Sequence, residues 1–519
     1  MSLLRNFATV GGATATSRVL GFVRDIFIAA ALGTGPVADA FFVAFRFPNL
    51  FRRVFAEGAF NSAFVPLFAK ALEGEGDDAG RRFGEEALAA LLTALLVFVA
   101  IAEIAMPLLM LVLAPGFVSD PDKFDLAVLL TRIAFPYLAL VSLVAFYSGV
   151  LNARGRFAVA AFAPALLNVV FIVALVLLLW FDYADSPQAG IVLAWATLVG
   201  GVAQLAVVFF ASARDRMVFR LRLPRLTAGV RHLWSLAVPG ILAGGIIQIN
   251  IVIGTMIASL APGAVSYLYY ADRIYQLPLG IVGIAIGIVL LPDLSRQLRA
   301  GRMDIVDHLQ NRSLEFSMAL TLPAAVALVV MATPIIDVLF QRASFGATDT
   351  AATAAALSAF AIGLPAFVLV KVFSPGFFAR EDTRTPMIFA GVSVAANVAV
   401  SLALFPFLAH VGIAIATSLA GWINAGLLAG TLARRGQFTA DPTVRKRLPL
   451  LAAASVMMGL CLYAAMWLLA DWLAAPSLAV RAGAVGVLVV FGMAVFAVFC
   501  QLTGAFDFRE AVNSLRKRG

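Results

Sequence analysis

The sequence predicts an all-α polytopic membrane protein with 14 transmembrane helices. Of its 519 residues, 62% are hydrophobic and 13% are charged, and the mean hydropathy is +0.97. Apolar runs of about 20 residues, the length that spans a bilayer, recur along the whole chain. An internal repeat relates the first six of these runs to the next six. No soluble globular class has this composition, so the chain is expected to cross a membrane many times.

The expected spans follow from hydropathy and from the short polar segments between them. The first half contains six, at 7–32, 36–68, 86–113, 127–152, 157–181 and 188–213. The second half contains eight, at 232–258, 263–296, 313–340, 350–378, 386–407, 412–433, 447–473 and 478–502. The span 36–68 would be roughly 50 Å long, well beyond the ~30 Å hydrocarbon core. We expect it to bend near Pro48 and to act as a gate; simple extension into the cytoplasm is the alternative.

The repeat defines two lobes and an appended pair. Phe146–Arg156, followed by Asn168 and then by Gly190–Thr197, matches Phe373–Arg380, followed by Asn397 and then by Gly412–Thr417, about 222–229 residues later. Six helices separate the copies, so both copies have the same topology, and the repeat axis is expected along the membrane normal. The predicted domains are an N-lobe (1–215), a C-lobe (216–435), and a C-terminal part (436–519) with the last two helices and a cytoplasmic tail. Two facing lobes are typical of alternating-access transporters.

The distribution of lysine and arginine predicts the orientation. With both termini in the cytoplasm, 27 of the 38 basic residues fall in cytoplasmic segments and three on the opposite side, namely Lys123, Arg342 and Arg481. This bias follows the positive-inside rule. It also accounts for the net charge of +9 through topology and contact with anionic membrane lipids, so no nucleic-acid partner is expected.

Several function classes find no support in the sequence. Cys461 and Cys500 lie in different late helices, and the three histidines are scattered, so neither a disulfide framework nor a metal site is expected. No P-loop motif is present, so ATP is not expected to be the direct energy source. No paired-aspartate metal site or general base is evident, and we therefore expect a transporter and not an enzyme.

Basic residues inside the apolar spans are the main functional signal. Burying a cation in hydrocarbon costs at least ~2.5–3.5 kcal/mol, so such a residue normally faces a partner or a wet cavity. Arg132 can reach the interface, and Lys371 is expected either to contact substrate or to tie the lobes together. The other six are Arg18, Arg24, Arg46, Arg52, Arg53 and Arg273.

These six arginines are expected to converge in a cavity between the lobes. Asp39, Arg46 and Arg53 are seven residues apart, with Asn49 between them at helical spacing, and Arg18 and Asp25 are also seven apart. Four acids, Asp25, Asp39, Glu57 and Asp272, leave a surplus of two positive charges. Arginine binds phosphate oxygens bidentately, so the surplus suits a pyrophosphate. Arg24–Asp25 and Arg46–Asp39 can alternatively satisfy each other as structural pairs.

Seven short motifs, spread along the chain, resemble those of a known protein family. They are Ser17–Asp25, Asp39–Asn49, Leu50–Phe60, Pro164–Asn168, Tyr269–Pro278, Leu290–Ser295 and Val370–Phe377. Together they resemble the MurJ (MviN) lipid II flippases of bacterial peptidoglycan synthesis, and the likeness spans essentially the whole chain. The resemblance implies a MOP-superfamily fold in the bacterial cytoplasmic (inner) membrane. It also implies movement of undecaprenyl-diphosphate-linked peptidoglycan precursor to the periplasmic leaflet.

The resemblance also implies roles for individual residues. Arg18, Arg24, Arg52 and Arg273 would hold the diphosphate, Asn49 would be a polar cavity residue, and the four acids would be their partners. The last two helices would form a groove for the lipid tail. Lipid II, membrane lipids and cell-wall synthesis proteins are the partners considered. Some relatives bind sodium in the second lobe. The nearest equivalents of those ligands in this chain are Asn250, Asn397, Ser401 and Thr417, and none of them is a carboxylate. Bound sodium is therefore not expected; membrane potential or another ion gradient would drive transport.

Two other functions remain open. A polyprenyl-linked O-antigen or exopolysaccharide flippase would share the architecture and the lipid diphosphate. A MATE-like cation-coupled exporter would share the superfamily, but such carriers typically have twelve helices and acidic cavities. Substrate exchange distinguishes the first alternative, and transport of cationic dyes distinguishes the second.

Overall fold

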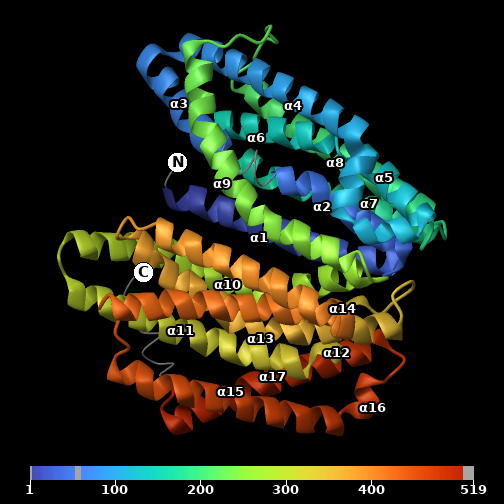
Figure 1. Ribbon diagram of the computed structural model, residues 1–519, viewed down its shortest axis with the longest axis vertical. Coiled ribbons are helices and arrows are strands. Elements are labelled where there is room, and N and C mark those ends of the chain that lie inside the picture. The colour runs from blue at the N-terminus through green and yellow to red at the C-terminus, as the bar shows by residue number, and fades with distance from the viewer. Residues whose placement is uncertain (1–2, 53–59, 507–519) are drawn as a thin grey trace. The chain divides into compact units, whose positions relative to one another are not determined.

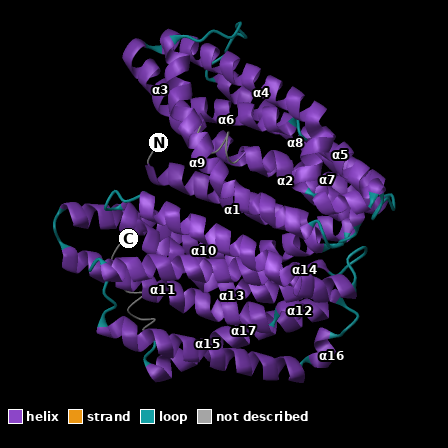
Figure 2. Cartoon of the chain, viewed as in Figure 1, coloured by secondary structure: helices purple, strands orange, loops and turns teal. Residues whose placement is uncertain are grey.

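The computed structural model describes residues 3–52 and 60–506, and the part of the chain that it describes is helical without β-strands (Figures 1 and 2). Two compact units divide the chain. Unit 1 comprises residues 1–266 and 342–346, and unit 2 comprises residues 267–341 and 347–519. Nine helices of the described part are long and apolar enough to cross a membrane. The chain is thus a multi-pass helical membrane protein, whereas the count of 14 spans stays a prediction.

Unit 1 is a bundle in which helices distant in the sequence pack on one another. α1 lies beside α7, α7 beside α8, and α9 against α3 and α4. Its helices are α1 (Leu3–Leu32), α2 (Pro36–Arg52), α3 (Phe60–Glu75), α4 (Asp77–Leu113), α5 (Pro121–Ala134), α6 (Tyr137–Ala153), α7 (Phe157–Trp180), α8 (Pro187–Arg214) and α9 (Ala228–Ala258), with the 3-10 turn η2 (Pro115–Ser119). The sequence places α9 in the C-lobe, whereas here it packs within unit 1. The predicted lobes follow the internal repeat, whereas the two units are defined by compactness, so the lobe boundaries stay a prediction.

Unit 2 holds the remaining helices. α11, α13 and α15 run side by side (Figure 1). The helices are α10 (Ala264–Arg299), whose first turn belongs to unit 1, then α11 (Met303–Val330), α12 (Ala332–Phe340), α13 (Ala347–Phe378), α14 (Arg384–Arg434), α15 (Pro442–Leu468), α16 (Ala470–Leu473) and α17 (Leu478–Thr503). α14 contains two antiparallel halves that turn at Ala409 (φ 44°). The halves are joined by the bond from Ser393 Oγ to the Ala420 carbonyl (2.8 Å).

Side-chain caps and prolines fix where several helices begin. Asp120, Ser186 and Asp441 each accept a hydrogen bond from the backbone N–H three residues later, and each is followed by a proline at the first helical position. The cap satisfies one of the free N–H groups of the first turn, and the proline has no N–H to satisfy. Thr227 caps α9 in the same way without a proline.

Three expected spans are interrupted within the described residues, and a fourth is described only in part. One of the three, 447–473, breaks at Leu469 between α15 and α16. The span 36–68 is described as α2 and α3, separated by residues 53–59, which lie outside the described part; Pro48 lies inside α2. The span 127–152 breaks between α5 and α6 at Phe135 and Pro136. The span 313–340 breaks between α11 and α12 at Met331, three residues before Pro334. A proline removes a backbone donor and clashes with the preceding turn, which accounts for the last two breaks.

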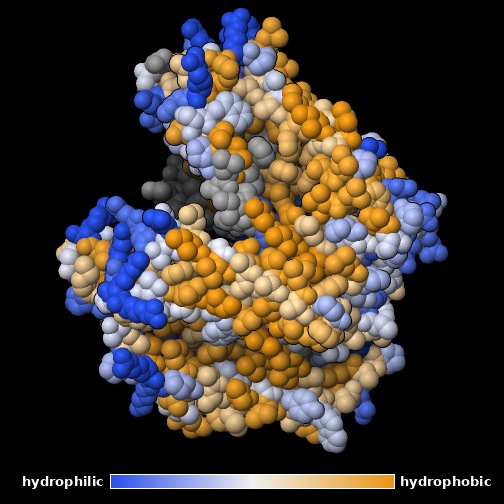
Figure 3. Space-filling model, viewed as in Figure 1, coloured by the Kyte–Doolittle hydropathy of each residue, from blue (hydrophilic) through white to orange (hydrophobic). Residues whose placement is uncertain are grey.

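The C-terminal helices α15 and α17 share an apolar core with α11. Met458 and Leu462 of α15 pack with Leu488 and Phe496 of α17 and with Ala319 of α11. Hydrophobic side chains cover much of the surface, and hydrophilic ones gather at the loop ends (Figure 3). A lipid-facing helix is expected to show this pattern, since apolar side chains meet the acyl chains.

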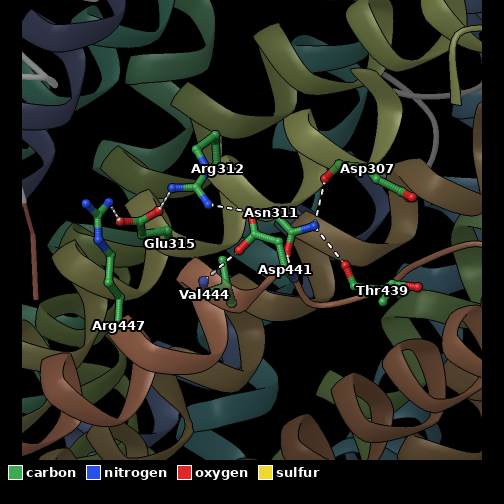
Figure 4. Close-up of polar contacts among 8 residues, drawn as sticks. All are labelled: Asp307, Asn311, Arg312, Glu315, Thr439, Asp441, Val444 and Arg447. Atoms are coloured by element: carbon green, nitrogen blue, oxygen red, sulfur yellow. Dashed lines mark hydrogen bonds and ion pairs between the residues drawn. The ribbon is translucent and has the colours of Figure 1, made fainter. Parts of the chain in front are cut away.

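A polar network joins α15 to α11 at one end of this core (Figure 4). Glu315, which is buried, pairs with both Arg312 and Arg447. Arg312 also binds Asp441 at 2.6 Å, and Asn311 donates to the Thr439 carbonyl at 2.9 Å. Partial burial raises the pKa of Asp441, but hydrogen bonds from the Val444 N–H and Arg312 outweigh it and lower the pKa overall. Within unit 2, α15 of the appended pair is therefore attached to α11 through ionic as well as apolar contacts.

Candidate functional site

Arg24 of α1 is buried and held by polar partners on two helices. Its Nε and Nη2 atoms donate to Asp25 Oδ1 at 3.0 and 2.7 Å, and its Nη1 donates to Asn168 Oδ1 of α7 at 2.9 Å. The guanidinium lies 5.6 Å from the ring centroids of both Phe45 and Phe171, within cation–π range. The Arg24–Asp25 pair that the sequence left open as a structural pair is therefore formed.

Asn168 also fixes the position of α1. Its Nδ2 donates to the Ser17 carbonyl at 3.0 Å, and a side chain at Gly21 would meet the Asn168 amide at 3.6 Å. One amide thus contacts the backbone next to Arg18 and the side chain of Arg24. Arg18 itself is exposed. The sequence singled out Asn168 as a repeat residue, but nothing in the sequence indicated that it binds Arg24.

Two polar residues near the end of α2, Asn49 and Arg52, are hydrogen-bonded to each other. Asn49 Nδ2 donates to the Phe45 carbonyl at 2.7 Å, and Arg52 Nε donates to Asn49 Oδ1 at 3.1 Å. Phe45 thus contacts Asn49 through its backbone carbonyl and Arg24 through its ring. Two of the predicted site residues, Arg53 and Glu57, lie outside the described residues.

The other two charged residues of α2 have partners that the sequence did not indicate. Arg46 Nη1 donates to Thr255 Oγ1 of α9 at 2.8 Å. Asp39 is fully buried and pairs with Lys123 of α5 at 2.7 Å, so the pair Arg46–Asp39 is replaced by two separate contacts. Lys123 lies over the Phe117 ring, 4.2 Å from its centroid.

Asp39 also holds the connection between α9 and α10. Its Oδ2 accepts from the Gly263 N–H at 2.9 Å, and its Oδ1 accepts from the N–H and Oγ of Ser266 at 3.0 and 2.7 Å. Gly263 has φ +72°, a conformation that glycine adopts without strain. The carboxylate therefore joins α2, α5 and this connection within unit 1. Sequence spacing gave no signal for Lys123, Gly263 or Ser266 as its partners.

Arg273 and Asp272 belong to unit 2. The Arg273 guanidinium lies 4.6 Å from the Tyr269 ring centroid, and its Nη2 donates to the Tyr269 hydroxyl at 3.0 Å. Asp272 Oδ2 accepts a hydrogen bond from Gln276. Tyr269, one helical turn before Arg273, thus orients the guanidinium. Convergence of Arg273 with the arginines of unit 1 stays a prediction.

The two remaining intramembrane cations differ in setting. Arg132 is exposed and its Nε donates to the Glu103 carbonyl at 3.2 Å. The stem of Lys371 crosses α10 so closely that a Cβ at Gly283 would lie 2.7 Å from the lysine Cδ. Lys371 therefore links α13 to α10 inside unit 2.

A cluster of neutral oxygens lies between the two halves of α14. Asn397 Oδ1 accepts from Ser401 Oγ at 3.5 Å and from Thr417 Oγ1 at 3.4 Å. These are three of the four positions that the sequence compared with a sodium site. Asn250 is in α9 of unit 1. The three residues in unit 2 therefore offer one neutral amide group and two hydroxyl groups.

Comparisons with known proteins agree over nearly the full length. The family model described as lipid II flippase MurJ matches residues 28–481. Across all 519 residues the chain is 51% identical to the probable lipid II flippase MurJ of Rhizobium meliloti (strain 1021), with 96% of that protein covered. It is 37% identical to the lipid II flippase MurJ of Burkholderia cenocepacia, over 89% of this chain and 90% of the relative.

Solved structures show the same fold. A lipid II flippase MurJ in an inward closed conformation matches with a TM-score of 0.78 at 24% identity, covering 97% of this chain and 99% of that one. An inward-facing multidrug resistance MATE transporter of the MOP superfamily matches with a TM-score of 0.66 at 16% identity, over 81% and 95%. At these identities the likeness concerns the fold.

Proposed function

The chain belongs to the lipid II flippase MurJ family, and we propose from this premise that it moves lipid II from the cytoplasmic to the periplasmic leaflet. The observation that carries the proposal is the 51% identity over the full chain with a probable lipid II flippase. The arginines inside apolar helices supply the chemistry that a lipid diphosphate needs. Relatives of this family are named as flippases, which are transporters and not enzymes.

The proposed substrate site uses arginines from both units. Arg18, Arg24 and Arg52 would hold the diphosphate from one side and Arg273 from the other, with Arg46, Arg53 and Asn49 around them. Asp25 orients Arg24, and Tyr269 orients Arg273. Orienting a guanidinium in advance lowers the entropy lost when it binds phosphate. Glu57, Asp39 and Asp272 would support the cavity and its gates.

Transport would proceed by alternating access. A ligand shifts a conformational equilibrium only through its different affinities for the two states. If diphosphate engages arginines of both units at once, it stabilises the state in which they are close, and opening toward the periplasm then releases the head group. We further propose 14 spans with both termini in the cytoplasm of the bacterial inner membrane. Membrane potential would supply ~2.3 kcal/mol per charge per 100 mV.

Acute depletion of the protein tests this function. Lipid II accessible at the outer leaflet is expected to fall while the total lipid II in the membrane does not fall. Expression of the wild-type chain should restore accessibility. If accessibility is unchanged while an O-antigen or exopolysaccharide precursor accumulates inside, the substrate is a different polyprenyl-linked sugar. If only cationic dyes accumulate, the protein is an exporter.

The neutral cluster at Asn397 predicts that flipping does not depend on sodium. Carboxylates are prominent among the oxygen ligands of hard cations, whereas this cluster offers one neutral amide carbonyl, from Asn397, and the hydroxyl groups of Ser401 and Thr417. Replacing sodium by potassium at constant ionic strength is expected to leave both the flipping rate and the melting temperature unchanged. The matched variant Ser401→Asp places a carboxylate in this buried cluster, and it should gain a sodium-dependent rise in melting temperature. A sodium-dependent wild type would contradict the prediction.

A further inference from the structure

A groove of about 270 Å³ opens on the surface of unit 1, and neither Arg24 nor any of its partners described above lines it. Its walls come from α4, from the connection between α8 and α9, and from the start of α9. The lining residues are Ala90, Thr93, Ala94, Pro224, Arg225, Leu226 and Trp234. Alanine and threonine on α4 leave the space open. The groove is smaller than the cavities of roughly 300–1,000 Å³ that enclose whole ligands, so it suits part of a larger molecule.

One end of the groove is cationic. Arg225 is exposed and makes no hydrogen bond or ion pair with any residue that the structure describes. Arg231 is also exposed, and its Nε donates to the carbonyl of the lining residue Leu226 at 3.4 Å. Glu86, one turn before Ala90 on α4, accepts a hydrogen bond from Thr227 at 2.7 Å. Two guanidinium groups against one carboxylate leave the groove with one positive charge in excess.

The other end of the groove is apolar and continues along α4. Val97, Ile101, Ile104 and Leu108 follow Ala94 at spacings of three and four residues, so they line one face of the helix. Their side chains are 54–81% exposed, and α4 is among the helices apolar enough to span a membrane. Hydrophobic side chains cover the visible surface along α4, and hydrophilic ones gather at the loop end of unit 1 (Figure 3). This face suits an acyl chain.

Trp234 marks the depth of the groove in the bilayer. It lies seven residues into α9, and tryptophan is enriched where the head groups meet the hydrocarbon region. The polar end of the groove belongs to a connection that carries six arginines between residues 214 and 231, on the side that the charge distribution assigns to the cytoplasm. Anionic lipids of that leaflet attract such segments.

From these observations we propose that the groove binds one anionic phospholipid. Its phosphate contacts Arg225 and Arg231, its glycerol backbone fills the space beside Ala90 and Ala94, and one acyl chain follows the exposed face of α4. The excess positive charge favours a head group with net negative charge over a zwitterionic one. This site is separate from the proposed substrate arginines, and its existence does not depend on what the protein transports.

Native mass spectrometry of the purified full-length chain tests the site. Delipidated protein is titrated with phosphatidylglycerol and, in parallel, with phosphatidylcholine. Wild type is expected to bind one phosphatidylglycerol more tightly than any further copy, and more tightly than phosphatidylcholine. Arg225→Gln should weaken that first binding event roughly fivefold or more, since one surface cation near an anionic lipid contributes on that scale. Ala94→Trp, which fills the groove without changing charge, should weaken it as well.

A matched variant separates the site from general charge attraction. Arg302→Gln removes an exposed cation at the start of α11 in unit 2, and it is expected to leave the first binding event unchanged. Equal loss in Arg302→Gln, equal binding of phosphatidylcholine, or displacement by inorganic phosphate alone would overturn the proposal. Displacement by undecaprenyl diphosphate and not by phosphatidylglycerol would reassign the groove to the transported lipid. Melting temperatures near that of wild type confirm that each variant is folded.

Discussion

Replacing Arg24 by alanine is expected to abolish flipping and also to lower the free energy of unfolding by about 3–5 kcal/mol. The side chain of Asp25 is 3% exposed, and alanine at position 24 removes the cation that donates two of its hydrogen bonds. A buried carboxylate that loses a paired cation carries a large desolvation cost. Asn168 loses a donor at the same time. Thermal unfolding in detergent measures the stability, and complementation of a flippase-depleted strain measures the function.

The double variant Arg24→Ala/Asp25→Ala separates the two effects. The double variant removes the carboxylate together with its Arg24 partner. Its loss of unfolding free energy is therefore expected to be smaller than the sum of the losses in the two single variants. Flipping is expected to stay lost. Arg18→Ala is the matched control, because Arg18 is exposed on the same helix and its loss should impair flipping with little change in melting temperature. Full complementation by Arg24→Ala would mean that Arg24 is not one of the arginines that hold the diphosphate in the proposed substrate site.

The contacts that the sequence could predict are local ones. Arg24 and Asp25 are adjacent, and Asn49 and Arg52 are three residues apart, so helical spacing alone brings each pair together. The partners of Asp39 are 84 residues away at Lys123 and 227 residues away at Ser266. Such contacts depend on which helices pack together, and hydropathy carries no information about that. This is why the sequence paired Asp39 with Arg46 on its own helix.

The helical architecture was predictable because apolar runs are long and frequent, but breaks inside those runs were not. Pro136 and Pro334 lie at or near helix breaks, whereas Pro164 and Pro323 lie within continuous helices. Neighbouring helices in a membrane protein can satisfy the backbone groups that a proline leaves free. A proline in an apolar run therefore marks a candidate break, and packing decides whether the helix ends there.

Replacing Asp39 by asparagine is the second change expected to have a large effect, again about 3–5 kcal/mol in the free energy of unfolding. The carboxylate accepts four hydrogen bonds, from Lys123, Gly263 and Ser266. An asparagine amide has a single acceptor oxygen, and its NH₂ group would face N–H donors. Lys123, only 8% exposed, would keep the Phe117 ring as a weak partner but lose its counter-ion.

The variant Asp39→Asn/Lys123→Met tests whether the lysine causes this cost. Methionine removes the charge while keeping an unbranched chain over Phe117, so the double variant should be more stable than Asp39→Asn alone. The connection that Asp39 holds leads directly into α10, which carries Arg273, so limited proteolysis within residues 259–266 should accelerate in the single variant. Slower cleavage, or a double variant that loses the sum of both single effects, would mean that the carboxylate does not hold this connection.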